Sequence, residues 1–511
     1  MVYCLRGFGR SPTTENVKKK GLSMNRLLKL VGFDVSKETT VKTELVAGVV
    51  TFLAMAYILT VNPNQIVGEG SPYWSSVFIA TALGAVVGTL LMAFLAKMPL
   101  AQASGMGLNS MIGGIIGGWG GYGAAFTPGQ AFMLVLISGV VFLLLSVIVI
   151  KGKTVRELVF DGMPLSVRSA ISVGIGLFIA FIGFQNAKVI GDDPYVLIKL
   201  VDFTVFDVNT TNALVCIVGL FIISVLDKLS VKGSVIIGVV CAAIIGIPLG
   251  VTDLSILAGS GDISWKFWNN FANFFAGENT VFFSFGKVFS EGIAPEGVSI
   301  FTVVMILITL CMIDMFDTMG TIVGCCGGNR VLSDEENKPR NYGKIMLADS
   351  VATCTGAILG TSTVTTFVES GAGVSAGGRT GLTALSSATL FFASMFALPV
   401  FAAVPSAAAA SALVYVGVLM MKNNFKYIDF SNAINATSAF LTIAIMVLSY
   451  SITKGIGVGM ISFVAMSLLS YVVELVRYVI KKGEKPVFDV SVVAIIIALL
   501  FCVYFFVPVV I

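Results

Sequence analysis

Four acidic residues lie inside long apolar stretches of the sequence, and chemistry is expected at these positions. They are Asp314, Asp317, Asp349 and Glu369. An ionisable group inside an apolar segment of membrane-spanning length is costly to bury and usually has a function. The alternative is a structural ion pair, but these stretches hold no Lys or Arg away from their boundaries, where Arg379 lies. A functional role is therefore favoured for the four acids as a set, while a structural ion pair remains a reasonable alternative for Asp349 alone.

Asp314 and Asp317 are three residues apart, so they share one face of a helix. Two carboxylates in an apolar cavity repel each other and resist ionisation. Such a pair can take up a proton on one side of a membrane and release it on the other. Because the chain has no histidine, a group that exchanges protons near neutrality must be a carboxylate or a thiol. We therefore expect proton coupling to use Asp314, Asp317 and Asp349.

Glu369 is well placed to accept hydrogen bonds from a neutral ligand that carries several N–H donors. A cavity lined by carboxylates repels anions. Asn109 and the N–H groups at helix N-termini can donate hydrogen bonds to the acceptor atoms of the ligand. A flat heterocycle fits this set better than a sugar or a lipid. The candidate substrate-binding residues are Glu369, Asn109, Gly105, Gly107, Ser370, Gly371 and Phe367. We expect no metal ligands and no cofactor.

The composition indicates that these residues lie in a protein embedded in a membrane. Of the 511 residues 56% are hydrophobic and only 12% are charged, against about 25% charged in soluble domains. Such a chain cannot cover a water-facing surface, so it is an integral membrane protein. The absence of histidine also excludes His-ligated metals and Ser-His nucleophile pairs.

Apolar segments near the length of a membrane-spanning helix follow one another along the chain. We predict fourteen spans, at about 43–62, 76–96, 99–117, 129–150, 165–185, 211–227, 232–250, 298–324, 343–361, 363–379, 381–402, 406–421, 436–453 and 456–476. With the N-terminus cytoplasmic, 27 of the 32 Lys and Arg residues fall on the inner side, as membrane proteins prefer. This bias explains the net charge of +4 without a nucleic-acid partner. The apolar segment 488–508 is either a fifteenth span or a hairpin against the bundle.

An internal repeat relates the two halves of the chain. Residues 80–89 (ATALGAVVGT) match residues 352–361 (ATCTGAILGT), and the SGMG of 104–107 matches the SGAG of 370–373. Seven spans, an odd number, separate the copies, so the halves are inverted, an architecture typical of secondary transporters.

The third and tenth spans have the composition of broken helices. The run Thr363 to Val368 is rich in β-branched residues, which favour extended chain. We expect a short strand followed by a half-helix in each span, because irregular backbone at membrane depth must be buried or line a cavity. The alternative is that the glycines only let helices pack closely. The fold class is therefore an all-α polytopic membrane protein, a seven-plus-seven inverted repeat with short strands in spans 3 and 10.

Four motifs resemble those of the AzgA-like hypoxanthine/guanine/adenine permeases of the nucleobase/ascorbate transporter superfamily. They are FLAMAYILTVNP at 52–63, GMGLN at 105–109, DMFDTMGTIVG at 314–324 and GTSTVTTFVESGAGVSAGGRTGLT at 360–383. The resemblance implies that Asp314 and Glu369 bind the base and that Asp317 and Asp349 serve coupling or site architecture. Residues 110–112 (SMI) stand where the family usually has Ala and bulky aromatics, which predicts a roomier cavity near the third span.

The resemblance also implies a domain organisation. Two segments, 43–150 and 298–402, form a core domain, and two others, 151–250 and 403–480, form a gate domain. A cytoplasmic tail (1–42), an extracellular loop (251–297) that lies partly on the interface, and a C-terminal apolar segment (481–511) complete the chain. The family often forms homodimers through the gate domains.

The expected function is import of purine bases across the cell membrane by proton symport, with alternating access between core and gate. A sodium-coupled nucleobase transporter is an alternative, because the same carboxylates can help to bind sodium. Less favoured are an anion exchanger or channel of the same fold and an intramembrane aspartyl enzyme. Carboxylates repel anions, which argues against the anion exchanger. The two aspartates at positions i and i+3 of one helix do not face each other across a cleft, so we expect no enzyme.

Overall fold

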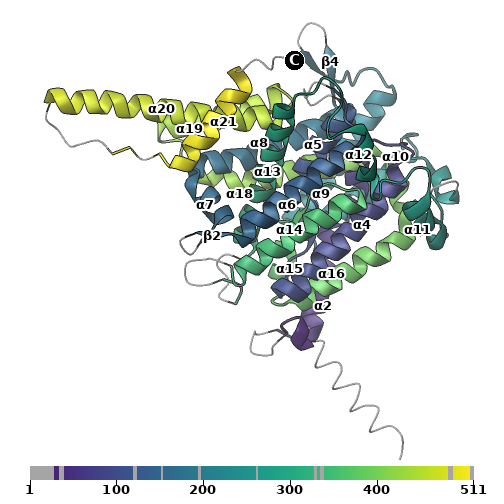
Figure 1. Ribbon diagram of the computed structural model, residues 1–511. Coiled ribbons are helices and arrows are strands. Elements are labelled where there is room, and N and C mark those ends of the chain that lie inside the picture. The colour runs from purple at the N-terminus through teal and green to yellow at the C-terminus, as the bar shows by residue number, and fades with distance from the viewer. Residues whose placement is uncertain are drawn as a thin grey trace, which may run out of the picture.

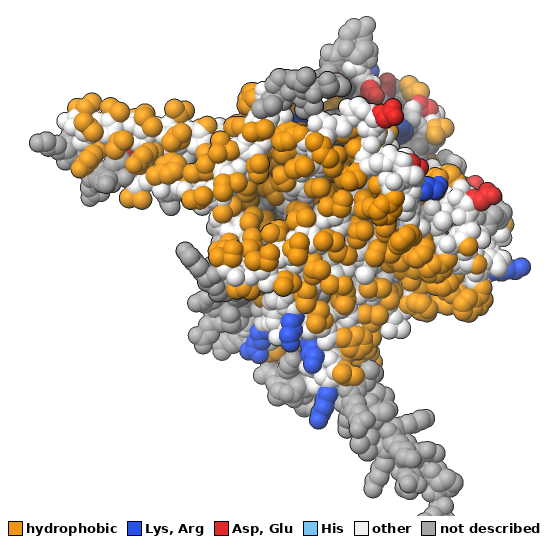
Figure 2. All heavy atoms as spheres, in the orientation of Figure 1, with side chains coloured by type: hydrophobic (Ala, Val, Ile, Leu, Met, Phe, Trp, Pro, Cys, Tyr) orange, Lys and Arg blue, Asp and Glu red, His pale blue; other side chains and the backbone are white. Residues whose placement is uncertain are grey.

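The computed structural model shows a bundle of helices (Figure 1), and the described residues also form three pairs of short strands. On the face in Figure 2, apolar side chains cover the broad middle, basic ones gather at the lower end and acidic ones at the upper right. This distribution is typical of a protein surrounded by lipid. The residues described are 28–33, 39–118, 124–150, 153–193, 197–259, 263–326, 331–333, 339–481, 487–488 and 490–506. Most of the predicted tail 1–42 lies outside them.

The first half of the chain begins with two helices that together cross the bundle. Its elements are α2 (Val41–Met55), α3 (Ile58–Ile66), α4 (Trp74–Leu91) with the π-helical end η2 (Met92–Ala96), β1 (Gln102–Ser104), α5 (Met106–Gly117), α6 (Pro128–Val147), α7 (Val155–Gly162), α8 (Leu165–Asn186), α9 (Val208–Lys228) and α10 (Ser234–Gly246). Surface hairpins are formed by β2 (Val149–Ile150) with β3 (Lys153–Thr154) and by β4 (Ile190–Asp193) with β5 (Leu197–Leu200).

The second half begins with the long helix that carries the DxxDT motif. Its elements are α13 (Ile300–Cys326), α14 (Tyr342–Leu359), β6 (Val364–Thr366), α15 (Ser370–Ser375), α16 (Gly381–Ser394), α17 (Leu398–Ala402), α18 (Ser406–Asn424), α19 (Ala433–Leu448), α20 (Ile452–Lys481) and α21 (Val492–Phe506). Among the described residues nine helices are long and apolar enough to cross a membrane, and four shorter apolar helices accompany them. Helix α21 covers most of the segment 488–508 and packs against α20.

Local sequence fixes where several helices begin. Thr127 accepts a hydrogen bond from the N–H of Gln130, whose side chain accepts from the N–H of Thr127, and Pro128 follows. This capping box pairs N–H groups that a helix start leaves without partners. The side chains of Asn432 and Asp207 cap the starts of α19 and α9 by accepting hydrogen bonds from backbone N–H groups of the first turn.

Two groups of helices pack mainly among themselves. In one group α4 contacts α14, α16 and α3, while α6 contacts α14 and α13. In the other group α8 contacts α18 and α19, and α18 also contacts α9 and α10. The polar connections α7 and η6 (Phe425–Tyr427) lie at the edges of these groups. The candidate site must therefore be sought where the two groups face each other and where strands interrupt the helices.

The segment 251–297 is partly helical. It contains η3 (Leu254–Ala258), α11 (Phe267–Ala276), η4 (Ser284–Lys287) and α12 (Val288–Glu291). On α11 the Phe267 ring stacks on Phe396, with ring centroids 4.1 Å apart. Trp268 is 76% exposed. A short helix with packed rings on one side and an exposed Trp suits a position at the membrane–water interface.

The strands β1 and β6 come from opposite halves of the chain and pair antiparallel at the centre of the structure. Gln102 pairs with Thr366 and Ser104 with Val364. The repeated glycines pack against this pair from both sides. A Cβ added at Gly84 of α4 would lie 3.1 Å from Val364 Cγ2, and one at Gly356 of α14 would lie 2.6 Å from the same atom. Helices α4 and α14 therefore enclose the strands because their facing positions have no side chain.

Replacing Gly356 by valine should destabilise the protein, because the new side chain would displace β6. Overpacking a filled core costs about 1–3 kcal/mol. Gly343→Val is the matched control, since Gly343 lies on the same helix and a Cβ there meets nothing within 4 Å. The measurement is the melting temperature of the detergent-purified protein. Equal melting temperatures for the two variants would contradict this packing role.

Candidate functional site

The two broken spans are held together by backbone hydrogen bonds beyond the strand pair itself. The N–H of Gly105 donates to the carbonyl of Thr363 at 3.0 Å, and the N–H of Phe367 donates to the carbonyl of Ala101 at 3.1 Å. The hydroxyl of Ser370 accepts from the N–H of Ala101 at 3.0 Å. The unwound backbone thus has its partners inside the protein, as low-dielectric surroundings require.

The predicted glycines of the site lie where the half-helices begin. Gly105 precedes α5, and a Cβ there would lie 3.0 Å from Thr365 Oγ1. A Cβ at Gly107 would lie 2.8 Å from Ile175 of α8. At Gly371 a Cβ would meet only Cys325 Sγ, at an ordinary 3.6 Å. Gly105 and Gly107 therefore allow close packing of α5, whereas Gly371 has room beside it.

Glu369 stands directly before α15 and is 9% exposed. Its Oε1 accepts a hydrogen bond from the hydroxyl of Tyr57 at 2.5 Å. Tyr57 lies between α2 and α3 and is buried. Sequence reasoning did not select Tyr57, although it lies inside the FLAMAYILTVNP motif. The hydroxyl of Tyr57 therefore orients the carboxylate of Glu369. Because Tyr57 is neutral, it does not compensate the negative charge of that carboxylate.

Helix α13 carries the two aspartates of the DxxDT motif. Asp314 is buried, and its Oδ2 accepts from the hydroxyl of Thr353 at 3.3 Å. Its Oδ1 has no hydrogen-bond partner among the described residues. Asp317 lies three residues further along α13 and is partly exposed, and α13 contacts α15, the half-helix that follows Glu369.

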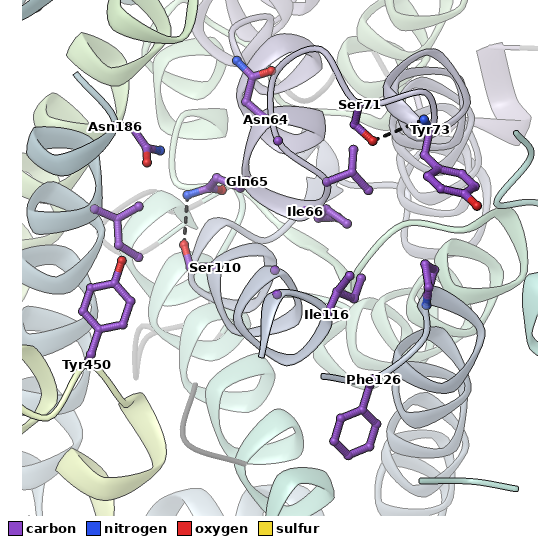
Figure 3. Close-up of a pocket in the computed structure, with 16 residues that line it drawn as sticks. Asn64, Gln65, Ile66, Ser71, Tyr73, Ser110, Ile116, Phe126, Asn186 and Tyr450 are labelled. Atoms are coloured by element: carbon purple, nitrogen blue, oxygen red, sulfur yellow. Dashed lines mark hydrogen bonds between the residues drawn. The ribbon is translucent and has the colours of Figure 1, made fainter. Parts of the chain in front are cut away.

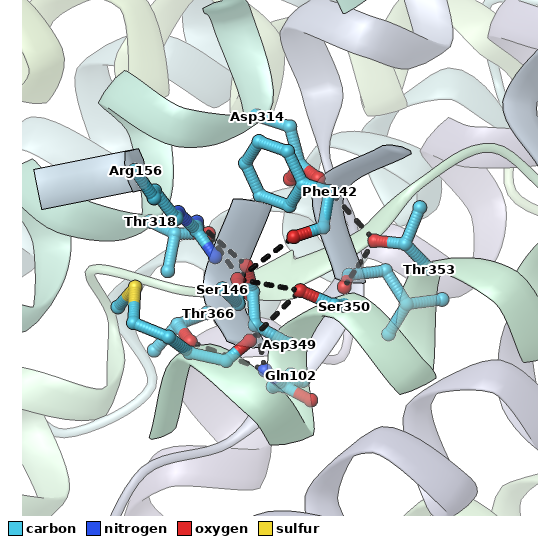
Figure 4. A network of polar contacts seen from close by, with 12 residues as sticks. Gln102, Phe142, Ser146, Arg156, Asp314, Thr318, Asp349, Ser350, Thr353 and Thr366 are labelled. Atoms are coloured by element: carbon cyan, nitrogen blue, oxygen red, sulfur yellow. Dashed lines mark hydrogen bonds and ion pairs between the residues drawn. The ribbon is translucent and has the colours of Figure 1, made fainter. Parts of the chain in front are cut away.

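Asp349 of α14 forms an ion pair, which was considered from the sequence only as the alternative for this residue. Its Oδ2 lies 3.0 Å from Nη2 of Arg156, and both side chains are fully buried. Its Oδ1 accepts from Thr318 at 2.9 Å and from Gln102 at 3.2 Å. Figure 4 shows these side chains converging on the carboxylate. We call these four residues the Asp349 network.

Arg156 corrects the expectation that the buried acids have no basic neighbour. It belongs to α7, between the fourth and fifth predicted spans, where it was counted among the cytoplasmic charges. The structure instead places its guanidinium over the ring of Phe142, 3.8 Å from the ring centroid (Figure 4). No local pattern predicts this placement, because the residue that supplies the positive charge lies outside the apolar segments.

Asn109 lies in the first turns of α5 and is fully buried. Its Oδ1 accepts from the hydroxyl of Ser104 at 2.8 Å and from the hydroxyl of Ser362. Its Nδ2 reaches the carbonyl of Ser104 at 3.4 Å. Asn109 thus ties the half-helix α5 to both broken spans, and its contacts in this structure are with the protein itself.

A cavity of about 540 Å³ lies where α3, α5 and α6 face the end of α8 and the turn between α19 and α20 (Figure 3). None of the acids Asp314, Asp317, Asp349 and Glu369 lines it. Ser110, one of the positions that departs from the family pattern, lines it. The remaining lining residues are Asn64, Gln65, Ile66, Val67, Gly68, Ser71, Tyr73, Gly113, Ile116, Gly117, Phe126, Pro128, Ile182, Asn186 and Tyr450.

Comparison with known proteins places this arrangement in a family. The pattern that defines the permease family matches residues 42–458, a stretch that includes all four buried acids and the strand pair. The chain belongs to this family, the nucleobase/ascorbate transporters.

Named relatives of this permease cover most of its length. It is 36% identical to the guanine/hypoxanthine permease PbuO of Bacillus subtilis over 84% of this chain and 91% of that one. It is 33% identical to the adenine permease AdeP of Escherichia coli over 91% of this chain and 92% of that one. A putative permease of Methanocaldococcus jannaschii is 33% identical over 83% and 89%. All three names describe transporters, which does not favour an intramembrane enzyme.

Solved structures similar to this permease show the same fold at low sequence identity. The transmembrane domain of the cyanobacterial bicarbonate transporter BicA superposes with a TM-score of 0.53 at 15% identity, covering 82% of this chain and 96% of that one. The structure of SLC26A9 gives a TM-score of 0.54 at 10% identity, covering 93% and 73%. At this identity the likeness describes the fold alone.

Arg156→Gln should destabilise this permease strongly, because it leaves the Asp349 charge buried without its counter-ion. Breaking one partner of a buried ion pair costs about 3–5 kcal/mol. The double variant Arg156→Gln with Asp349→Asn removes both charges and should recover most of the loss. The measurement is the melting temperature of the detergent-purified protein, with Lys228→Gln, which removes an exposed charge, as control. A double variant no more stable than the single one would contradict the ion-pair role.

Proposed function

We propose that this permease imports purine bases, hypoxanthine, guanine or adenine, across the cell membrane by proton symport. The observation that carries the proposal is Glu369, a buried carboxylate whose partner is the neutral Tyr57, at the point where a broken span resumes as a helix. A base presents N–H donors to which such a carboxylate can bind. The names of PbuO and AdeP support the same substrate class.

Binding of the base is assigned to Glu369 and Asp314. Glu369 Oε1 is oriented by Tyr57, and Asp314 keeps one oxygen without a partner among the described residues. Hydrogen bonds to a charged acceptor are roughly twice as strong as neutral ones. Phe367, Ser370, Gly371, Gly105, Gly107 and Asn109 shape the surrounding backbone through the contacts described above.

The coupling proton is assigned to Asp317. It is partly exposed and lies three residues from Asp314 on α13, and of two neighbouring carboxylates in an apolar environment one takes up a proton more readily. Asp349 has a counter-ion in Arg156, and we therefore assign it to site architecture. No resident cofactor is proposed. Sodium coupling is the second candidate, because carboxylate oxygens also bind that cation.

Transport is proposed to proceed by alternating access. The group of helices around α4 and α14 would be the core domain, and the group around α8 and α18 the gate domain. The architecture proposed is the fourteen-span inverted repeat with a cytoplasmic N-terminus, and dimers would form through the gate domains. The cavity lined by both groups supports a rocking motion between them.

A proton gradient should drive accumulation of radiolabelled hypoxanthine in proteoliposomes that contain the wild-type protein. Asp317→Asn cannot take up the coupling proton, so it should still exchange hypoxanthine across the membrane but no longer accumulate it. The same vesicles with a sodium gradient separate the two coupling ions. Absence of accumulation of any purine under either gradient would refute the proposed function.

Glu369→Ala should weaken hypoxanthine binding to the purified protein by roughly 10- to 100-fold, because a hydrogen bond to a charged group contributes about 1.5–3 kcal/mol. Tyr57→Phe keeps the carboxylate but removes its positioning donor, so its loss of affinity should be smaller. Glu291→Ala removes an exposed glutamate and should bind normally. Isothermal titration calorimetry measures all three, and unchanged affinity in Glu369→Ala would remove this residue from the site.

A further inference from the structure

The cavity of about 540 Å³ is separate from the acids assigned to base binding. Two neighbouring residues at the end of α3, Asn64 and Gln65, lie on one side of it, with Ser110 of α5 below them (Figure 3). Asn186 and Tyr450 face them from the other group of helices (Figure 3). The volume is within the range of about 300–1,000 Å³ that small-molecule sites usually have.

The lining of this cavity is polar but uncharged. Its sixteen residues include no Asp, Glu, Lys or Arg. It offers instead the amides of Asn64, Gln65 and Asn186 and the rings of Tyr73 and Phe126. A charged ligand would lose its hydration here without gaining a counter-ion. The chemistry therefore favours a neutral ligand with hydrogen-bonding edges and a flat apolar face.

Two buried amide atoms at this cavity have no partner in the part of the chain that the structure describes. Gln65 donates through Nε2 to Ser110 Oγ at 2.9 Å, and its Oε1 has no partner. Asn64 accepts through Oδ1 from Trp74 Nε1 at 2.6 Å, and its Nδ2 has no partner. An unpaired buried polar group costs about 1–3 kcal/mol. Adjacent residues thus offer one free acceptor and one free donor.

We propose that this cavity is a second binding site for the transported base, which the base occupies before it reaches Glu369. A purine carries an N–H donor beside a carbonyl or ring-nitrogen acceptor, and this edge complements Gln65 Oε1 and Asn64 Nδ2. Amide side chains form hydrogen bonds to the donors and acceptors of base edges, and aromatic rings stack on bases. The inference rests on the proposed transport of bases.

The position of the cavity suits a site on the entry route. The hydroxyl of Ser110 accepts from Gln65 and donates to the carbonyl of Met106 at 3.2 Å. Met106 is the first residue of α5, directly after the strand pair. One chain of hydrogen bonds therefore connects the cavity to the broken spans. With the proposed cytoplasmic N-terminus, the α3–α4 connection that lines the cavity is extracellular.

Cysteine protection tests this site in the full-length protein in proteoliposomes. Ser71→Cys places a thiol at the cavity, and hypoxanthine should slow its labelling by a membrane-impermeant methanethiosulfonate several-fold. This protection should persist when Glu369→Ala is added and be lost when Gln65→Met is added. Asn64→Asp keeps the acceptor for Trp74 but removes the free donor, so it should also reduce protection. Ser290→Cys, exposed on α12 outside the cavity, is the control that hypoxanthine should not protect.

The outcomes separate this inference from the proposed function. Protection that disappears with Glu369→Ala would show that the cavity responds only to the central site, and it would overturn the inference. Uptake of hypoxanthine by the wild type without any protection of Ser71→Cys would overturn the inference and leave the proposed function standing. Failure of uptake under either gradient would overturn both.

Discussion

Backbone that leaves the helix at membrane depth must find its hydrogen-bond partners within the protein, and the rest of this structure depends on how it does so. The chain leaves the helical conformation at Gln102–Ser104 and at Val364–Thr366, and these two segments pair with each other as β1 and β6. Side chains of the flanking helices complete the pairing, since Thr89 of α4 bonds to both backbone groups of Gln102 and Thr353 of α14 donates to the carbonyl of Val364. The pairing of β1 with β6 therefore determines where the half-helices, the glycine contacts and the acids lie.

The buried carboxylates of Asp349 and Glu369 differ in what faces them. Asp349 is neutralised by Arg156 and oriented by two further donors, so it stabilises the junction between α14, α13 and α7. Glu369 is held by a phenol that carries no charge. A buried carboxylate without a counter-ion is costly unless a ligand or a proton compensates it. This contrast is why ligand binding is placed at Glu369 and architecture at Asp349.

The fold by itself does not identify what is carried. Bicarbonate transporter BicA and SLC26A9 share the architecture at 10–15% identity, whereas relatives at 33–36% identity are named purine permeases. The identity of the transported substrate is therefore decided by the residues of the binding site and not by the fold. In this chain the residues that we propose for this role are acids near the strand pair and neutral amides around the separate cavity, and both sets suit an uncharged heterocycle better than an anion.

The sequence by itself determined the membrane class, the apolar helices, the repeat and the family, because these follow from composition and from motifs that are local in the chain. It also selected the acids Asp314, Asp317, Asp349 and Glu369 through their cost of burial. Only the tertiary structure decided their partners. Arg156 reaches Asp349 from 193 positions away and Tyr57 reaches Glu369 from 312 positions away, and no local pattern encodes contacts over such separations. Whether a buried charge is neutralised depends on those partners, so the division of roles among the acids required the folded chain.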